Sequence, residues 1–208
     1  MVTVQSASAV EGLDAPRAAV VATRMAELMG LYTRPAGAVV GREVIDAVIH
    51  AAACAGIAEE VEARQPGDPA RAHALLRALI TSPIPTEEIP SLGAVLGYPR
   101  LAALAGTSEA SLRRYADGER AAPDDVAGRL HFLVQVFALL RGSFNEFGIR
   151  RWLERPRSAL DGRTPGTSDE RTDPRTSRSC EIGDSPGRPA VVWLAGRAAG
   201  PRKRTWAR

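Results

Sequence analysis

Cysteine is scarce in this sequence, and long apolar runs are missing. The 208 residues include only two cysteines, Cys54 and Cys180. Two cysteines so far apart provide neither a disulfide framework nor the paired spacing of a zinc site. No apolar stretch reaches the roughly 18 residues that a transmembrane helix needs, and the N-terminus does not resemble a signal peptide. We therefore expect a reduced, cytoplasmic protein with no membrane segment and no metal site.

Aromatic residues are also few, at 5% of the chain, whereas hydrophobic residues make up 45%. Alanine and leucine dominate the apolar set, which favours helices over sheets. The composition therefore predicts an all-α fold, a helical bundle. Lysine is almost absent, because Lys203 is the single lysine among 27 basic residues. Such a bias is typical of coding composition, so we do not interpret the arginine count as evidence of nucleic-acid binding.

The first 85 residues predict a disordered start, 1–13, followed by an N-terminal helical region, 14–85. Asp14 can cap a helix that runs to about Leu31. A second helix is expected over residues 42–63, and a third follows the Asp68-Pro69 start, because apolar residues recur there at helical spacing. This region shows no catalytic chemistry and is a candidate surface for a homo-oligomer.

Three side chains of this region are candidates for chemistry by type alone. Cys54 lies in an apolar helical run, which predicts a buried, inert thiol. His50 and His73 are isolated in the sequence, and a lone histidine is more often a surface or satisfied core residue than a ligand. We expect no catalytic role for any of the three.

The stretch from Leu101 to Tyr115, inside the segment 86–122, has the spacing of a helix-turn-helix. Ala102 allows close helix crossing, Gly106 permits the turn, and Leu112 faces the first helix together with Tyr115. The side chains that would then face DNA are Thr107, Ser108, Glu109, Ser111, Arg113 and Arg114. The alternative is an ordinary pair of helices whose arginines are merely solvated.

A long helix is predicted after Pro123. Apolar residues follow one another there at steps of four and three, which suits a helix that is central to a core or forms half of an interface. The apolar positions are Val126, Leu130, Leu133, Phe137 and Leu140. A capping box of Ser143 and Glu146 predicts the next helix, which would bury Phe144 or Phe147 and then Trp152 and Leu153 before Pro156.

With these features together, the sequence resembles the Xre/MbcA/ParS-type antitoxins. The helix-turn-helix, the long helix 129–141 and the run 147–165 carry the resemblance, and an Asn usual in the family is replaced by Arg157-Ser158. The motif residues of the run are Trp152, Leu153, Pro156, Leu160, Gly162 and Pro165.

The resemblance implies a toxin-binding domain at 123–165 and a binding function, not an enzyme. Its partners would be a RES-domain toxin that degrades NAD and the operator DNA of its own operon, and no cofactor would be needed. The implied toxin contacts are Phe137, Trp152, Leu153, Leu160, Gly162 and Pro165. The residues themselves contain no catalytic triad, phosphate loop or metal cluster, which agrees with a protein that is not an enzyme.

The final segment, 166–208, departs from the family pattern. It carries nine basic residues against five acidic ones, a net charge of +4, whereas the whole chain has +3. Its composition predicts a disordered basic tail. Two explanations stay open: a frameshift replaced the original end, or the tail adds affinity for phosphates. Two rival functions therefore also stay open, namely a stand-alone helix-turn-helix regulator and a degraded, non-functional relative.

Overall fold

Helices separated by short Gly- or Pro-containing breaks make up the described chain. The structure is a computed structural model that describes residues 12–156 and 164–165. Within these residues there are nine α-helices and no strand, which confirms the all-α prediction. The helices are α2 (Ala15–Leu28), α3 (Arg42–Cys54), α4 (Glu59–Glu62), α5 (Ala70–Ile80), α6 (Pro85–Leu96), α7 (Tyr98–Ala105), α8 (Glu109–Ala116), α9 (Asp124–Leu140) and α10 (Glu146–Glu154).

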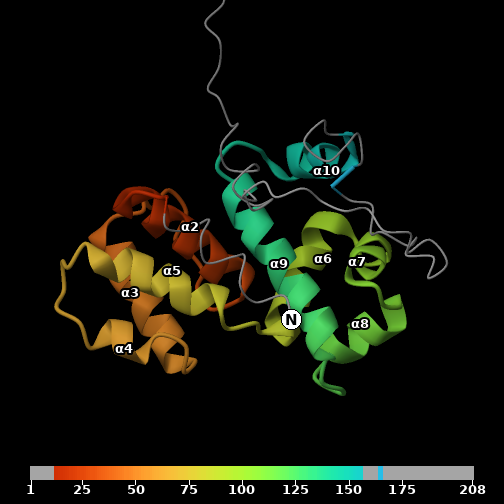
Figure 1. Cartoon of the computed structure of the whole chain (residues 1–208), viewed down its shortest axis with the longest axis horizontal. Coiled ribbons are helices and arrows are strands. Elements are labelled where there is room, and N and C mark those ends of the chain that lie inside the picture. The colour runs from red at the N-terminus through yellow and green to blue at the C-terminus, as the bar shows by residue number, and fades with distance from the viewer. Residues whose placement is uncertain (1–11, 157–163, 166–208) are drawn as a thin grey trace, which may run out of the picture.

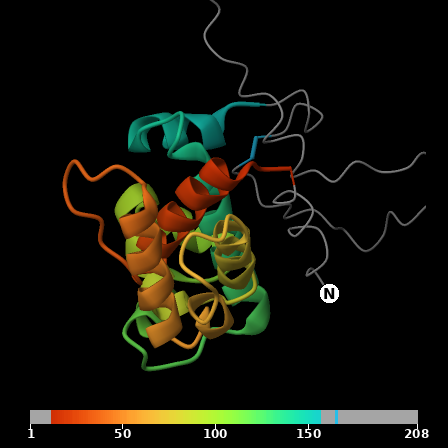
Figure 2. The same cartoon turned by 90° about the vertical axis from the view of Figure 1, so that its left-hand side faces the viewer.

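Helix α9 lies between two groups of helices (Figure 1). On one side α2 packs mainly against α5 and α3, and on the other α6 packs against α7 and α8. Helix α9 contacts α2, α6 and α7, so the buried residues form one continuous core. Figure 2, turned by 90°, shows α2 and α3 toward the viewer and α10 at the top of the molecule. No helix of the described part is both long and apolar enough to cross a bilayer.

The apolar seam of α9 is buried as the sequence predicts. Val126, Leu130, Leu133 and Phe137 lie in the core, and Leu140 is half-buried. Because α9 contacts helices on both sides, its apolar surface packs against other helices of the same chain. Of the two alternatives for this helix, a central position in the core is therefore the one observed.

The predicted starts of two N-terminal helices are correct. The Asp14 carboxylate accepts a hydrogen bond from the Arg17 backbone N–H at 2.9 Å at the start of α2. The Asp68 carboxylate accepts one from the Ala70 N–H at 2.8 Å before α5. Such acceptors satisfy backbone donors that a helix leaves unpaired at its first turn.

The prediction of one helix over 42–63 is wrong, because the chain breaks into α3 and α4 at Gly56. The backbone of Gly56 has φ +75°, a left-handed conformation that favours glycine. The Ile57 N–H donates to the Ala52 carbonyl at 3.0 Å, and the Gly56 N–H donates to the Ala53 carbonyl at 2.8 Å. These two bonds form a Schellman motif, which ends α3.

The predicted capping box of α10 is also wrong. Asn145, not Ser143, caps the helix, since its side-chain oxygen accepts from the Gly148 N–H at 2.9 Å. Helix α10 buries Ile149 together with Trp152 and Leu153. Phe144 and Phe147, one of which was expected to be buried, are both exposed. The predictions for residues 1–11 and 166–208, and those for Arg157, Ser158, Leu160 and Gly162, lie outside the described residues.

Candidate nucleic-acid interface

The turn between α7 and α8 has the predicted conformation. Gly106 ends α7 with φ 67° and ψ 38°, in the left-handed region. The Thr107 N–H donates to the Ala102 carbonyl at 3.0 Å, which closes the helix end. The Ser108 hydroxyl oxygen then accepts from the Ser111 N–H at 3.1 Å, so Ser108 is the N-cap of α8 as predicted. The sequence therefore predicted a helix, a tight turn and a second helix correctly here.

Helix α8 buries one side and exposes the other. Leu112 and Tyr115 lie in the core, as the spacing predicts. The six predicted DNA-facing residues all belong to the turn or to α8, and none of them is buried. Ser108, Glu109, Arg113 and Arg114 are exposed, while Thr107 and Ser111 are half-buried. A short helix with this division can present its N-terminal end and outer face to a DNA groove.

The two arginines of α8 are in different environments. The guanidinium of Arg113 lies over the ring of Tyr98, 4.5 Å from its centroid, so α7 holds this side chain in place. The Arg114 side chain is exposed and makes no hydrogen bond or ion pair with the described residues. Arg114 is therefore the arginine of α8 that is free to meet a phosphate or a guanine.

The segment around α8 is not strongly basic. Residues 98–125 contain four arginines, at 100, 113, 114 and 120, against five carboxylates, at 109, 117, 119, 124 and 125. Arg100 is further occupied by an ion pair with Glu154 at 2.6 Å, which joins α7 to α10. Non-specific attraction to the DNA backbone should therefore be weak, and recognition would depend on direct contacts.

Arg129 of α9 contacts the turn between α7 and α8. Its guanidinium donates to the Ala105 carbonyl at 2.7 Å and to the Asp125 carboxylate at 2.6 Å. A Cβ placed on Gly106 would lie 2.1 Å from Nη1 of Arg129. The left-handed backbone therefore favours glycine here, and a side chain at this position would also force the Arg129 guanidinium to move. The sequence predicted the first reason but gave no sign of the second.

Substituting Gly106→Ala is expected to lower the free energy of unfolding by about 2–4 kcal/mol. About 1–2 kcal/mol comes from the left-handed backbone of an L-residue. The remainder comes from the charged hydrogen bond of Arg129, which the new methyl group would displace. Urea denaturation followed by circular dichroism measures the change.

The matched control for this substitution is Gly128→Ala. Gly128 lies within α9, and a Cβ there meets nothing within 4 Å. Alanine should stabilise this site by about 0.5–1 kcal/mol, because glycine has the poorer helix propensity. Equal stability of the Gly106→Ala variant and the parent would contradict the observed turn.

The residues implied as toxin contacts are placed differently. The side chains of Phe137, Trp152 and Leu153 are buried in the core of this chain. Pro165 is half-buried, and Leu160 and Gly162 lie outside the described residues. Three of the six are therefore packing residues of the core, Phe137 on α9 and Trp152 and Leu153 on α10.

The exposed aromatic residues at this end are Phe144 and Phe147. Phe144 is 40% exposed, and Phe147 is 62% exposed with the guanidinium of Arg151 5.8 Å from its ring centroid. Exposed aromatic side chains are enriched where proteins bind partners. We expected one of them to be buried together with Trp152, but helix positions five residues apart, such as Phe147 and Trp152, lie on different faces.

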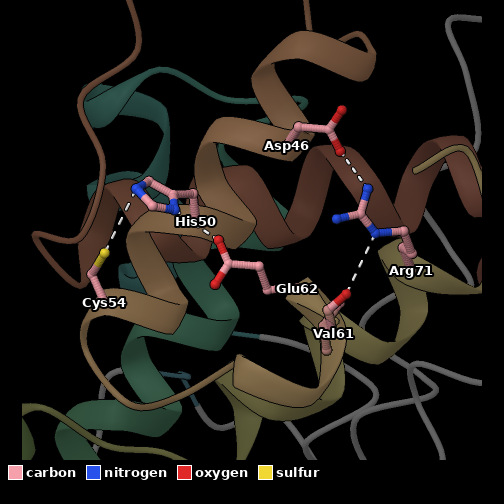
Figure 3. A network of polar contacts seen from close by, with 6 residues as sticks. All are labelled: Asp46, His50, Cys54, Val61, Glu62 and Arg71. Atoms are coloured by element: carbon pink, nitrogen blue, oxygen red, sulfur yellow. Dashed lines mark hydrogen bonds and ion pairs between the residues drawn. The ribbon is translucent and has the colours of Figure 1, made fainter. Parts of the chain in front are cut away.

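A polar network that the sequence also missed connects α3, α4 and α5 (Figure 3). Cys54 is exposed, which corrects the prediction of a buried thiol, because the buried stripe of α3 lies on another face. Its sulfur is 3.7 Å from Nε2 of His50, whose Nδ1 is 2.7 Å from the Glu62 carboxylate. The spacing of four residues between His50 and Cys54 was the available signal.

Comparison with protein-family models, with curated proteins and with solved structures finds no match to this chain. Within the part of the chain that the structure describes, no group of three or more His, Cys, Asp or Glu side chains is arranged to hold a metal ion.

Proposed function

We propose that this protein is an antitoxin-type transcription regulator of the cytoplasm. It binds operator DNA through α8 and neutralises a RES-domain, NAD-degrading toxin by direct contact. The proposed activity is binding, and no step of it requires catalysis or a cofactor. One observation carries the DNA-binding part: α8 has a buried inner face and exposes Ser108, Glu109 and Arg114 at its start and outer side.

The toxin-binding part is supported by the resemblance of the run 147–165 to the antitoxin family. The contact surface would be an exposed aromatic pair, Phe144 in the turn before α10 and Phe147 on α10. Phe144 and Phe147 would supply the anchors, while Trp152 and Leu153 hold α10 against the core. A second copy of the chain would place two α8 helices on one operator, as helix-turn-helix dimers do.

Replacing Arg114 with alanine is expected to weaken binding to the DNA upstream of this gene by about 10-fold or more. The reason is that Arg114 is exposed and has no partner among the described residues. Arg113→Ala should weaken DNA binding less, because the Arg113 guanidinium is stacked on Tyr98. Fluorescence anisotropy with a labelled duplex and with a scrambled duplex measures both effects.

The matched control is Arg77→Ala, which removes the same charge from an exposed site on α5. This variant should bind the duplex as the parent does, since α5 and α8 lie on opposite sides of α9 (Figure 1). Equal losses from Arg77→Ala and Arg114→Ala would indicate attraction by net charge alone. Equal binding to both duplexes would refute α8 as a recognition helix.

Replacing both Phe144 and Phe147 with serine is expected to abolish co-purification with the tagged product of the adjacent gene. Loss of a buried aromatic anchor costs about 2 kcal/mol or more at an interface. The control is Val39→Ser, which removes an apolar side chain that is 84% exposed in the loop between α2 and α3.

This experiment also separates the rival functions. An antitoxin rescues cells from the neighbouring gene product and co-purifies with it. A stand-alone regulator binds the duplex but has no stable partner. A degraded relative does neither, and this outcome would refute the proposed function altogether.

A further inference from the structure

Three polar side chains follow one another along one face of α3. Asp46, His50 and Cys54 are spaced four residues apart, so they form a single row. Glu62 approaches this row from α4, which the Schellman turn at Gly56 folds back toward α3. Figure 3 shows the imidazole of His50 between the sulfur of Cys54 and the carboxylate of Glu62. The break that the sequence did not predict is therefore what assembles this cluster.

The hydrogen bonds of the cluster fix the role of each imidazole nitrogen. The Glu62 carboxylate can only accept, so Nδ1 of His50 carries the proton and donates to it at 2.7 Å. In the neutral ring, Nε2 is then an acceptor, and it faces the Cys54 sulfur at 3.7 Å. A thiol next to a base whose far nitrogen is held by a carboxylate has the arrangement of an activated nucleophile.

The surroundings of the thiol are compatible with this role. A helix C-terminus disfavours a thiolate, and Cys54 is the last residue of α3. However, the carbonyls of Ala51, Ala52 and Ala53 are already occupied by backbone N–H groups of the turn. Arg71 is committed elsewhere, since it is 6% exposed and binds Asp46 and the Val61 carbonyl. His50 is thus the group positioned to take the thiol proton.

Exposure decides which reactants can reach the sulfur. Cys54 and His50 are both open to solvent. A small soluble reactant can therefore reach the sulfur. Water can reach it too, whereas an enzyme active site usually excludes water. A metal is not the favoured occupant, because the described part of the chain supplies no third ligand.

We propose that Cys54 is a site of reversible S-thiolation by low-molecular-weight disulfides, with His50 as the base and Glu62 as its positioning residue. The thiol proton moves to Nε2 of His50 as the sulfur attacks one sulfur of the disulfide. A new S–S bond to Cys54 forms while the disulfide bond breaks. The departing thiolate takes the proton back from His50, so the products are a mixed disulfide and one free thiol.

The test measures the reaction of the full chain with the chromophoric disulfide DTNB between pH 6 and 8. The parent for this test carries Cys180→Ser, so that Cys54 is the single thiol. In the His50→Gln variant the rate at pH 7 should fall by about 10-fold, because a positioned base is lost. The rate of this variant should also fall about tenfold for each pH unit below the pKa of an unassisted thiol, whereas the parent rate should fall less steeply.

Two controls make the result specific. His73→Gln removes a histidine of α5 whose Nε2 bonds the Leu13 carbonyl, and it should leave the rate unchanged. Glu62→Gln should give a rate between those of the parent and His50→Gln, because it weakens only the orientation of the ring. Circular dichroism spectra of all variants check that the helices are retained.

A physiological type of disulfide completes the experiment. After incubation with oxidised glutathione, peptide mass mapping should find the glutathione adduct on Cys54. Treatment with a reducing thiol should then remove this adduct. The proposal is overturned if His50→Gln and His73→Gln react at the same rate, or if no adduct forms on Cys54. None of these readouts depends on DNA or toxin binding, so the proposed function can fail independently.

Discussion

Replacing Glu88 with alanine is expected to lower the free energy of unfolding by about 3–5 kcal/mol, because it removes one partner of a buried glutamate–histidine pair. Glu88 is fully buried in α6, and its Oε1 lies 2.7 Å from Nδ1 of His131 on α9. The same oxygen accepts from the Ile84 backbone N–H at 3.0 Å. The substitution would therefore remove the hydrogen-bond partner of both the His131 ring and the Ile84 N–H, and would leave a cavity.

His131 also connects this pair to a third helix, α5. Its Nε2 lies 2.9 Å from the Ile80 carbonyl at the end of α5, and a carbonyl can only accept, so Nε2 carries a proton. The ring therefore ties α9 to both α5 and α6. Chemical denaturation of the full chain measures the loss, and Glu88→Gln, which keeps the side-chain volume, should cost less than Glu88→Ala.

Glu87 provides the matched control for this prediction. It is the preceding glutamate of the same helix turn, but it is exposed. Glu87→Ala should change the free energy of unfolding by no more than about 0.5 kcal/mol, as is usual for surface sites. Similar small effects at both positions would show that the buried pair does not hold α6 to α9.

Replacing Phe137 with alanine is expected to cost about 3–5 kcal/mol, the range for removing a fully buried aromatic side chain. Phe137 has no exposed surface and is among the largest fully buried side chains of the described core. It lies on α9, which packs against helices on both sides, so the surrounding structure cannot easily collapse onto the cavity. The midpoint of urea denaturation should fall accordingly.

The control for Phe137 is Phe147→Ala on α10. Phe147 is 62% exposed, so its loss should change stability by about 0.5 kcal/mol or less. The pair of variants also separates packing from partner binding. Phe137→Ala should destabilise the free chain, whereas Phe147→Ala should affect only complex formation. A stable Phe137→Ala variant that fails to bind a partner would contradict the buried position of this ring.

Local sequence signals account for the parts of the candidate interface that were predictable. Gly106, Ser108 and Leu112 act within one or two helical turns, through a left-handed backbone, a cap and a buried contact with the preceding helix. Their effects depend on near neighbours in the chain, so spacing alone can indicate them. Whether α8 meets DNA stays a prediction, because no contact within the chain bears on it.

The predictions that failed required knowledge of distant neighbours or of the choice between nearby caps. Ser143 and Asn145 are both good N-cap residues, and the helix uses Asn145. Phe144 and Phe147 are exposed because α10 buries the face that carries Ile149, Trp152 and Leu153. Cys54 was predicted to be buried because its run is apolar, but only one stripe of α3 meets the core. The prediction of a continuous helix over 42–63 did not take Gly56 into account, although a left-handed glycine commonly ends a helix.

The all-α class, most helix positions, the α7–turn–α8 motif and the apolar seam of α9 could be predicted from the sequence alone. These features follow from helix propensity, apolar period and caps, all of which act over a few residues. Only the tertiary structure decided that His131 meets Glu88, that Arg129 supports the turn at Gly106, and that Glu62 orients His50 beside Cys54. Each of these contacts joins side chains from different helices, and their pairing depends on how the helices pack, which local spacing does not encode.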